Sequence, residues 1–267
     1  MNKRLRVILG YIFILIGILM PLVAFSSMSY REISAGSKYK SFKDKKLQMT
    51  SSIKTYNEKV GKSEENIIDP FQNEDYKGFY NIDGLKEDDV FAYLIIPKLD
   101  MKKPIYLDAS YKHLNMGVAQ VEGTSLPLGG KSTRSVIAGH RGWWGDLMFY
   151  NIDKLEVGDE ILIDGRTGLL KYRVSGQEII DPSDWESILP IKGKDMITLL
   201  SCHPKRPPRP KRLLVNAERV VDEKPVEKIE RQEKKNFPYL KYAIFAITII
   251  GWISILGVFI SLYKFLK

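Results

Sequence analysis

The side chains whose types and positions in this sequence suggest catalytic chemistry are one thiol, three imidazoles and a group of arginines close to the thiol. Cys202 is the one cysteine, and it follows the strand-like run Met196–Leu200. His140 also stands just after an apolar run, and Arg212 opens a third run beyond the thiol. If these strands are neighbours, a nucleophile, an acid–base group and an oxyanion donor converge at one edge of the sheet.

Each of these residues also has an ordinary structural explanation. A single cysteine is often a small buried apolar residue. A histidine before Arg-Gly is often in a turn, and an arginine is often a surface charge. Arg206 and Arg209 also lie near Cys202 in the sequence. We choose Arg212 among the three arginines because Leu213–Val215 anchors it at a strand end, whereas the other two lie in a proline-rich loop.

The segments that must position these residues are short and strand-like, and Gly, Pro and Asp separate them. Many short strands at close spacing predict a mainly β fold, a sandwich or a barrel. The expected strands are Phe91–Ile96, one beginning at Pro104–Tyr106, Ser135–Ala138, Glu160–Ile163, Leu169–Val174, Gln177–Ile180, Met196–Leu200 and Leu213–Asn216.

Two uncharged apolar stretches flank this polar middle. Val7–Phe25 approaches the ~20 residues that a helix needs to cross a bilayer, and basic residues precede it, as the positive-inside rule expects. We interpret it as a retained anchor, and a cleaved signal peptide is the alternative. Ala243–Tyr263 is also uncharged and is followed by lysines. We interpret it as a second span rather than a buried core helix.

Two spans with both tips in the cytoplasm place the middle of the chain outside the membrane. The expected divisions are an N-terminal transmembrane anchor at 1–26, a helical stalk with a lid at 27–88, a catalytic barrel at 89–221, a charged linker at 222–241 and a C-terminal transmembrane helix at 242–263. The expected location is therefore the cell membrane, as a multi-pass protein with an extracellular catalytic domain.

Composition narrows the class of protein further. Lys and Arg total 41 against 32 Asp and Glu, which gives a formal net charge of +9. No zinc-finger spacing or RNP-type aromatic signature accompanies this charge, so we expect no nucleic-acid partner. Attraction to anionic lipid or wall polymer explains this positive charge better. A lone cysteine excludes an intrachain disulfide and a zinc site built on paired cysteines. A cysteine-poor domain outside the membrane suits a Gram-positive type of cell surface, where disulfides are not the usual device.

The motifs around the three candidate residues resemble those of sortases, the membrane-bound cysteine transpeptidases of Gram-positive bacteria. TLLSC ending at Cys202 resembles the family's TLxTC, GHRG contains His140, and RLLV opens with Arg212. LNMGVAQVEGTSLPLGG, residues 114–130, is similar to the pilus-building class C. The likeness covers roughly Phe91 to Val220. It implies a closed eight-stranded sortase-type β-barrel with short helices, an N-terminal helical or lid segment and two flanking transmembrane helices.

The same resemblance assigns roles to residues. It implies Cys202 as the nucleophile, His140 as the general acid and base, and Arg212 as the oxyanion or substrate stabiliser. A second span after the catalytic domain is typical of class C, and so is a lid with an Asp-Pro-aromatic motif. Asp69, Pro70 and Phe71 stand where such a lid lies. In such a lid we expect Phe71 to lie over Cys202 and Asp69 to pair with Arg212, because a carboxylate and a guanidinium match in geometry. The alternative is an ordinary loop, because this tripeptide also occurs in turns.

The sequence departs from class C after the thiol. Members of that class usually continue with a Thr-Pro-Tyr-Gly type of loop, but this chain has HPKRPPRPK, His203 to Lys211. That loop is one residue longer, more basic and more rigid. Gln120 stands where a histidine is common. These differences concern the substrate preference rather than the fold.

By resemblance, the substrates are pilins or surface proteins with an LPxTG-like sorting signal. Cys202 forms a thioester, and an amine acceptor, either a pilin lysine or a wall precursor, resolves it. No metal and no organic cofactor are implied. Three functions are distinguished: a pilin-polymerising transpeptidase, a housekeeping-type sortase that anchors proteins to peptidoglycan, and a non-catalytic membrane-tethered interaction protein. The second span and the Asp69-Pro70-Phe71 motif favour the first.

Overall fold

The computed structural model describes residues 3–43, 53, 56, 67–72, 85–142, 146–165, 167–221 and 238–267. These residues divide into two compact units, a pair of long helices and a β domain. The predicted charged linker lies mostly outside the described residues, since 222–237 are not among them.

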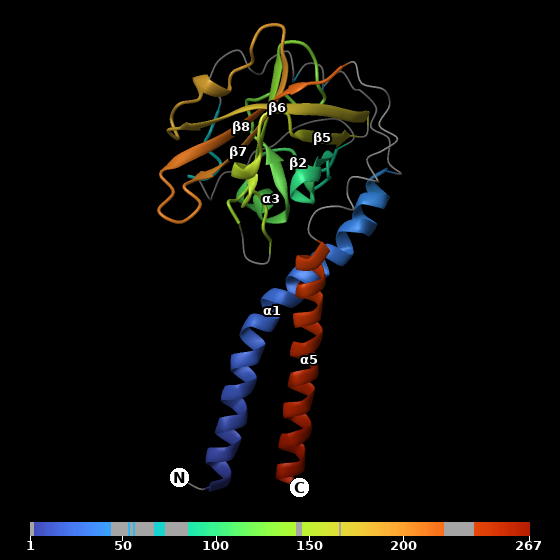
Figure 1. Ribbon diagram of the computed structural model, residues 1–267, viewed down its shortest axis with the longest axis vertical. Helices are drawn as coiled ribbons and strands as arrows, with labels where there is room; N and C mark the ends of the chain where they lie inside the picture. The colour runs from blue at the N-terminus through green and yellow to red at the C-terminus, as the bar shows by residue number, and fades with distance from the viewer. Residues whose placement is uncertain are drawn as a thin grey trace. The chain divides into compact units, whose positions relative to one another are not determined.

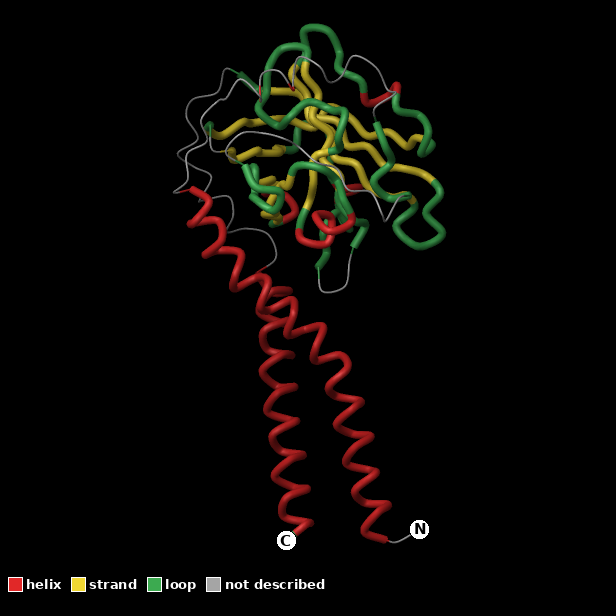
Figure 2. The backbone as a smooth tube through the Cα atoms, turned by 180° about the vertical axis from the view of Figure 1, so that it is seen from behind, coloured by secondary structure: helices red, strands yellow, loops and turns green. Residues whose placement is uncertain are grey.

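Eight strands of the described chain form a closed barrel in the order β1-β2-β3-β4-β7-β8-β6-β5 (Figure 1). Figure 2 shows the strands wrapped around one another, with loops and short helices at the rims. The prediction of a mainly β, eight-stranded barrel is therefore confirmed. The strands are β1 Ala92–Ile96, β2 Met101–Tyr106, β3 Val118–Gln120, β4 Thr133–Ala138, β5 Glu160–Gly165, β6 Gly168–Ile180, β7 Asp195–His203 and β8 Lys211–Arg219. The short helices are η2 Pro97–Leu99, α3 Tyr111–Met116, η3 Ile152–Lys154 and η4 Glu186–Ile188.

The barrel interior is filled by alternate apolar residues of every strand. Ile197 and Leu199 of β7 point inward, and so do Leu213 and Val215 of β8. All four are at most 3% exposed. Because successive side chains of a strand point to opposite faces, the residues between them face outward. Each fully buried Leu, Ile or Val contributes about 1.5–3 kcal/mol relative to exposure, so this interior supplies most of the barrel's stability.

A second apolar cluster covers the outer face of β3, β4, β7 and β8. Leu200 and Leu214, whose side chains alternate with the inward set, belong to this second cluster. Helix α3 contributes Leu114, and the loop between β6 and β7 contributes Trp185 and Ile188. This part of the barrel wall is therefore buried on both sides, unlike an ordinary solvent-facing sheet.

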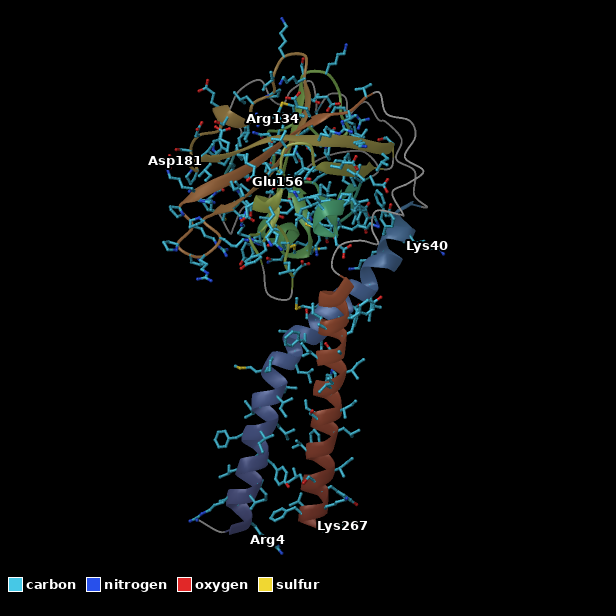
Figure 3. All side chains as sticks on the ribbon, viewed as in Figure 1. Arg4, Lys40, Arg134, Glu156, Asp181 and Lys267 are labelled. Atoms are coloured by element: carbon cyan, nitrogen blue, oxygen red, sulfur yellow. The ribbon has the colours of Figure 1, made fainter. Side chains whose placement is uncertain are left out.

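A buried arginine holds the β6–β7 loop on this outer face. Arg134 of β4, labelled in Figure 3, is 4% exposed. Its Nη1 donates to the carbonyl of Ser187 at 2.6 Å, and its Nη2 donates to Asn216 Oδ1 at 2.6 Å. Burial lowers the pKa of Arg134 to about 10. These contacts fix the loop that carries Trp185 to the sheet.

Two details of the strands differ from the sequence-based expectation. β3, at Val118–Gln120, was not expected, because three residues are too few to show a periodic pattern. The expected strands Leu169–Val174 and Gln177–Ile180 are one strand, β6, with a register shift between Val174 and Gly176. A bulge of this kind places an irregularity inside a continuous strand, which reads in the sequence as a break.

The other unit contains α1, Lys3–Lys43, and α5, Pro238–Leu266. Arg4–Tyr30 and Tyr242–Leu266 are long and apolar enough to cross a membrane. The two helices run antiparallel, so that Arg4 and Lys267 lie at the same end (Figures 1 and 3). Side-chain hydrogen bonds join the helices: Tyr11 with Ser261 at 2.8 Å, Ser29 with Thr248 at 3.0 Å, and Trp252 with Ser26 at 3.1 Å.

Candidate active site

The strand register brings the three predicted residues to one end of the barrel. β4 and β7 are parallel and pair Ala138 with Leu200. His140 and Cys202 each follow two residues later, so they leave neighbouring strands at the same level. β8 is antiparallel to β7, and its Arg212 lies directly opposite Cys202. The parallel register explains how residues 62 positions apart come to the same end of the barrel.

The side chains of Cys202 and Arg212 also share one face of the sheet. Arg212 and Leu214 are two residues apart on β8, and Cys202 and Leu200 are two apart on β7. Since Leu200 and Leu214 belong to the outer cluster, the two-residue period of a strand aims Cys202 and Arg212 outward as well. The thiol is therefore placed on the covered outer face of the barrel, not in its interior.

Asp69 lies against Arg212. Its Oδ2 accepts hydrogen bonds from Nη2 at 2.5 Å and from Nε at 3.1 Å. Both side chains are about 95% buried, with 5% of Asp69 and 4% of Arg212 exposed. Asp69 Oδ1 also accepts from the backbone N–H of Phe71 at 3.0 Å. The carboxylate therefore neutralises the guanidinium and turns its own segment back over the site.

Phe71 lies beside both Arg212 and His140. Its ring lies 5.3 Å from the guanidinium carbon of Arg212 and 6.0 Å from the ring centre of His140. These are the ring contacts that the structure gives for Phe71. The expectation that this ring lies over Cys202 itself stays a prediction. Pro70 is buried and holds the tight turn between the two side chains.

Helix α3 supplies two neighbours of His140 that the sequence motifs do not reveal. Asn115 Oδ1 lies 3.2 Å from His140 Nε2. An amide oxygen only accepts, so Nε2 carries the proton and, in the neutral ring, Nδ1 does not. Tyr111 meets the His140 ring edge-on at 5.8 Å. The sequence signal that could have placed this helix is its apolar residue Leu114, which packs into the outer cluster.

His113, which lies on α3, has a structural role. His113 is fully buried, its Nδ1 lies 2.9 Å from Asp108 Oδ1, and its Nε2 lies 3.2 Å from Asp88 Oδ1. Its ring stacks on Tyr106 at 4.9 Å. Burial acts to lower the pKa of His113, but the two carboxylates outweigh it and raise that pKa. These contacts hold α3, and with it Asn115, in place.

Burial sets the charge state of the reactive pair in this closed arrangement. Burial raises the pKa of the Cys202 thiol, and the carboxylate of Asp69 adds to that effect. Arg212 and Arg209 act in the opposite direction without overcoming it. Burial also lowers the pKa of His140 to about 4, and the positive charge of Arg209 assists. Near neutral pH the pair is therefore a thiol beside a neutral imidazole.

The alternative arginines occupy different positions from Arg212. Arg206 is exposed in the loop between β7 and β8. Arg209 points toward the β4–β5 side, where its Nη2 donates to the carbonyl oxygens of Arg141 and Lys205 at 3.3 and 3.0 Å. Of the three, Arg212 is the one that the register places opposite Cys202. Geometry thus favours Arg212 as the oxyanion donor.

Gln120 occupies a structural position near this face. It is fully buried, and its Nε2 donates to the carbonyl oxygens of Val121 and Thr124 at 2.7 and 2.8 Å. The side chain therefore holds the turn after β3 and is not aimed at the thiol. Among the described residues, no group of three or more His, Cys, Asp or Glu is arranged to hold a metal ion.

Comparisons with known proteins agree with this fold and site. The sequence model of the sortase domain matches residues 94–220. Sortase C-3 from Streptococcus pneumoniae is 38% identical with a TM-score of 0.62, covering 69% of this chain and 90% of that one. Sortase C-1 from Actinomyces oris is 33% identical with a TM-score of 0.57, covering 64% and 97%. Sortase A from Bacillus anthracis is 29% identical over 119 residues, or 45% of this chain.

A closed barrel with a cysteine, a histidine and an arginine at one end defines a cysteine transpeptidase fold. The chain belongs to the sortase family, and the solved structures that it resembles are sortases of class C. It spans 55% of the length of the Bacillus anthracis relative. The predicted class of protein is therefore confirmed, and the roles of the individual residues stay predictions.

Proposed function

We propose that this protein is a membrane-anchored transpeptidase that cleaves LPxTG-like sorting signals through a thioester and joins pilin subunits by isopeptide bonds. The observation that carries the proposal is the strand register, which sets Arg212 opposite Cys202 and His140 at the same level. A nucleophile, an oxyanion donor and an acid–base group are what acyl transfer requires.

The reaction follows from this geometry in two steps. The Cys202 thiol first gives its proton to His140. The thiolate Sγ then attacks the carbonyl carbon between Thr and Gly, and Arg212 donates hydrogen bonds to the oxyanion that develops. His140 protonates the leaving glycine amine, and the carbon–nitrogen bond breaks. An acceptor amine then attacks the thioester, the carbon–sulfur bond breaks, and Sγ leaves with its electron pair. Only the thiolate is nucleophilic, so the raised pKa of Cys202 must fall before the first step.

Asp69, Pro70 and Phe71 act as a lid on this site. While Asp69 neutralises Arg212, the oxyanion donor is occupied and the thiol is held protonated. Displacement of the lid admits water and frees the guanidinium, and both changes favour the thiolate. The segment thereby limits premature acylation and hydrolysis until a substrate replaces it.

The pair of apolar helices supports a multi-pass topology with the barrel outside the membrane. Lys3, Arg4 and Arg6 lie at the end of α1 that is beside Lys264 and Lys267 of α5. Positive residues at one shared end are what the positive-inside rule expects of a cytoplasmic face. The three side-chain hydrogen bonds between the helices favour a retained first span, because a cleaved one would leave their partners unpaired.

A pilin substrate is favoured over peptidoglycan anchoring by the relatives and by the lid. Sortase C1 of the group B Streptococcus pilus island 1 is 31% identical with a TM-score of 0.59, and this chain covers 87% of it. The name of that protein links it to a pilus. The acceptor under this proposal is a pilin lysine. A wall-precursor amine is the acceptor if the protein is a housekeeping-type sortase.

The test uses the full-length chain in detergent micelles with candidate pilins that carry LPxTG-like signals. The expected result is a covalent polymer whose new Thr–Lys isopeptide bond is found by mass spectrometry, with no polymer from Cys202→Ala. Attachment to a wall-precursor amine without pilin joining would support the housekeeping function instead. Polymer formed by Cys202→Ala would remove Cys202 from the mechanism.

A further inference from the structure

Unpaired buried donors gather beside the thiol. Within the described residues, six buried side-chain nitrogen or oxygen atoms have no hydrogen-bond partner. Four of them belong to neighbouring positions at this end of the barrel: Arg141 Nε and Nη1, Arg209 Nε and His203 Nδ1. Folded proteins seldom leave such groups unpaired, and a cluster of them indicates a site for a missing acceptor.

These donors belong to one connected structure, which we call the basic end: Arg141 and the loop His203–Lys211. Arg209 Nη2 donates to the carbonyl of Arg141 at 3.3 Å, which joins the loop to the residue after His140. Asp153 lies 3.0 Å from Arg141 Nη2 and 3.3 Å from Lys205 Nζ. Four prolines in the loop restrict its conformations, so the arginines are held in advance of any ligand.

Positive charge exceeds negative charge at the basic end. Lys211 pairs with Asp181 at 2.7 Å, and Asp153 is shared by Arg141 and Lys205. In the described part of the chain, neither Arg206 nor Arg209 has a carboxylate within ion-pair distance. Arg141 is only 1% exposed, so its charge is not dispersed by solvent. The missing acceptor is therefore an anion, and a guanidinium fork matches the geometry of a carboxylate.

The position of the basic end identifies which reactant brings the carboxylate. On β7 the residues before Cys202, such as Leu200, face the apolar outer cluster. The residues after it lead into the basic loop, the hairpin that joins β7 and β8 in Figure 1. The apolar residues of an LPxTG-like signal precede its scissile bond, so they suit the apolar side. The acceptor arrives from the other side of the thiol, where the basic end lies.

We propose that the basic end is an acceptor subsite that selects an amine whose neighbouring residue is acidic, with Arg209 holding the carboxylate and Arg141 supplying further positive charge. This inference rests on the proposed transpeptidase function. A bare ammonium is repelled by these cations, whereas a segment that carries its own carboxylate is attracted. The same cations favour the neutral form of the approaching lysine.

The neutral amine is the form that completes the reaction. Its nitrogen bonds to the thioester carbonyl carbon, the carbon–sulfur bond breaks, and the electron pair returns to Cys202 Sγ. The proton that the amine loses passes to His140, which restores a thiolate beside an imidazolium. A carboxylate held by Arg209 fixes the amine in line with this carbonyl and leaves Arg212 to the oxyanion.

The experiment is a competition between two acceptors in one tube. The full-length chain in detergent micelles receives one LPxTG-type donor peptide and equal amounts of two acceptor peptides, in which the reactive lysine is flanked by Glu or by Gln. Mass spectrometry measures the ratio of the two isopeptide products. We expect the Glu product to exceed the Gln product about tenfold at low salt, because a hydrogen bond to a charged group strengthens binding enough for a factor of this size. The excess should fall toward parity as salt rises.

Two variants locate the effect. Arg209→Gln should bring the product ratio close to one, whereas Lys192→Gln removes one positive charge from an exposed position outside the basic end and should leave the ratio within about twofold of the parent. The ratio is internal to each enzyme, so a change in overall rate does not alter it. Equal products from the parent enzyme, or equal losses in both variants, would overturn the subsite. No cleavage of the donor peptide would overturn the proposed function as well, whereas cleavage with equal products would overturn the subsite alone.

Discussion

Removal of the Asp69 carboxylate should activate the thiol of Cys202. In the closed arrangement Asp69 accepts three hydrogen bonds from Arg212, at 2.5, 3.1 and 3.3 Å, and Phe71 packs beside them. Asp69→Ala removes a negative charge that raises the pKa of Cys202 and frees a positive charge that lowers it. It also exposes the half-buried sulfur to more water, so burial raises that pKa less.

The size of the effect follows from the thiolate fraction. If the thiol pKa falls by about one unit, the thiolate present at neutral pH rises about tenfold, and labelling by a small alkylating reagent rises with it. The midpoint of the pH–rate profile should move to lower pH. Phe71→Ala should increase labelling less, because it opens the site without removing the carboxylate. Both variants should lose about 1–2 kcal/mol of stability, since contacts across the cleft are lost.

Ile68→Ala is the matched control, because this residue belongs to the same segment and is 47% exposed. Its labelling rate should equal that of the parent. The measurement is the rate of Cys202 alkylation in the full-length chain from pH 6 to about pH 10, which brackets the ordinary thiol range. Unchanged labelling in both Asp69→Ala and Phe71→Ala would mean that the segment is an ordinary loop. Cys202 would then be open or guarded by the basic loop.

Four further outcomes are expected. Cys202→Ala should abolish thioester formation, seen as loss of the acyl-enzyme mass, and should leave the circular dichroism spectrum unchanged. Arg212→Ala should lower kcat/KM for signal cleavage by about a hundredfold or more, whereas Arg206→Ala should cost less than about threefold. Asn115→Leu should lower the rate about tenfold and change the ¹⁵N shifts of the histidine ring that it contacts, and Asn115→Asp should restore most of the rate. Because the pKa of His113 is raised in the fold, its protonated ring should stabilise the folded protein. This contribution should be fully present below about pH 6.5 and should be lost as the pH rises through the pKa of the folded state. Thermal melts of the parent and of His113→Leu at several pH values measure it.

The sequence predicted the part of this site that lies on strands. Cys202 and Arg212 sit at strand ends, where two apolar runs fix both the register and the face of each side chain. A run of alternating apolar residues is enough to place such positions. The carboxylate of Asp69 was also expected beside Arg212, because a carboxylate and a guanidinium match in geometry, and the structure has this ion pair.

The remaining features of the site and fold depend on contacts between distant segments, and no local sequence pattern predicts these contacts. Asn115 reaches His140 from a six-residue helix, and the sequence shows neither the helix end nor its direction. Arg134 looks like a surface residue of β4, yet the β6–β7 loop folds back and buries it. In both cases the deciding interaction joins residues 25 or more positions apart. Local propensity does not encode such pairings.

The charges around the thiol suggest an order of events. Arg212 is neutralised by a carboxylate of its own chain, and it becomes available only when Asp69 leaves. Arg209 has no such internal partner among the described residues, and its Nε stays unpaired. The first reactant must therefore displace a bound carboxylate, whereas the second needs only to supply one. In an enzyme arranged in this way, Cys202 is acylated slowly without the proper signal peptide. Once acylated, the enzyme favours an amine acceptor with an acidic neighbouring residue over water. The partition between transfer and hydrolysis should accordingly depend on Arg209, and the first acylation on Asp69.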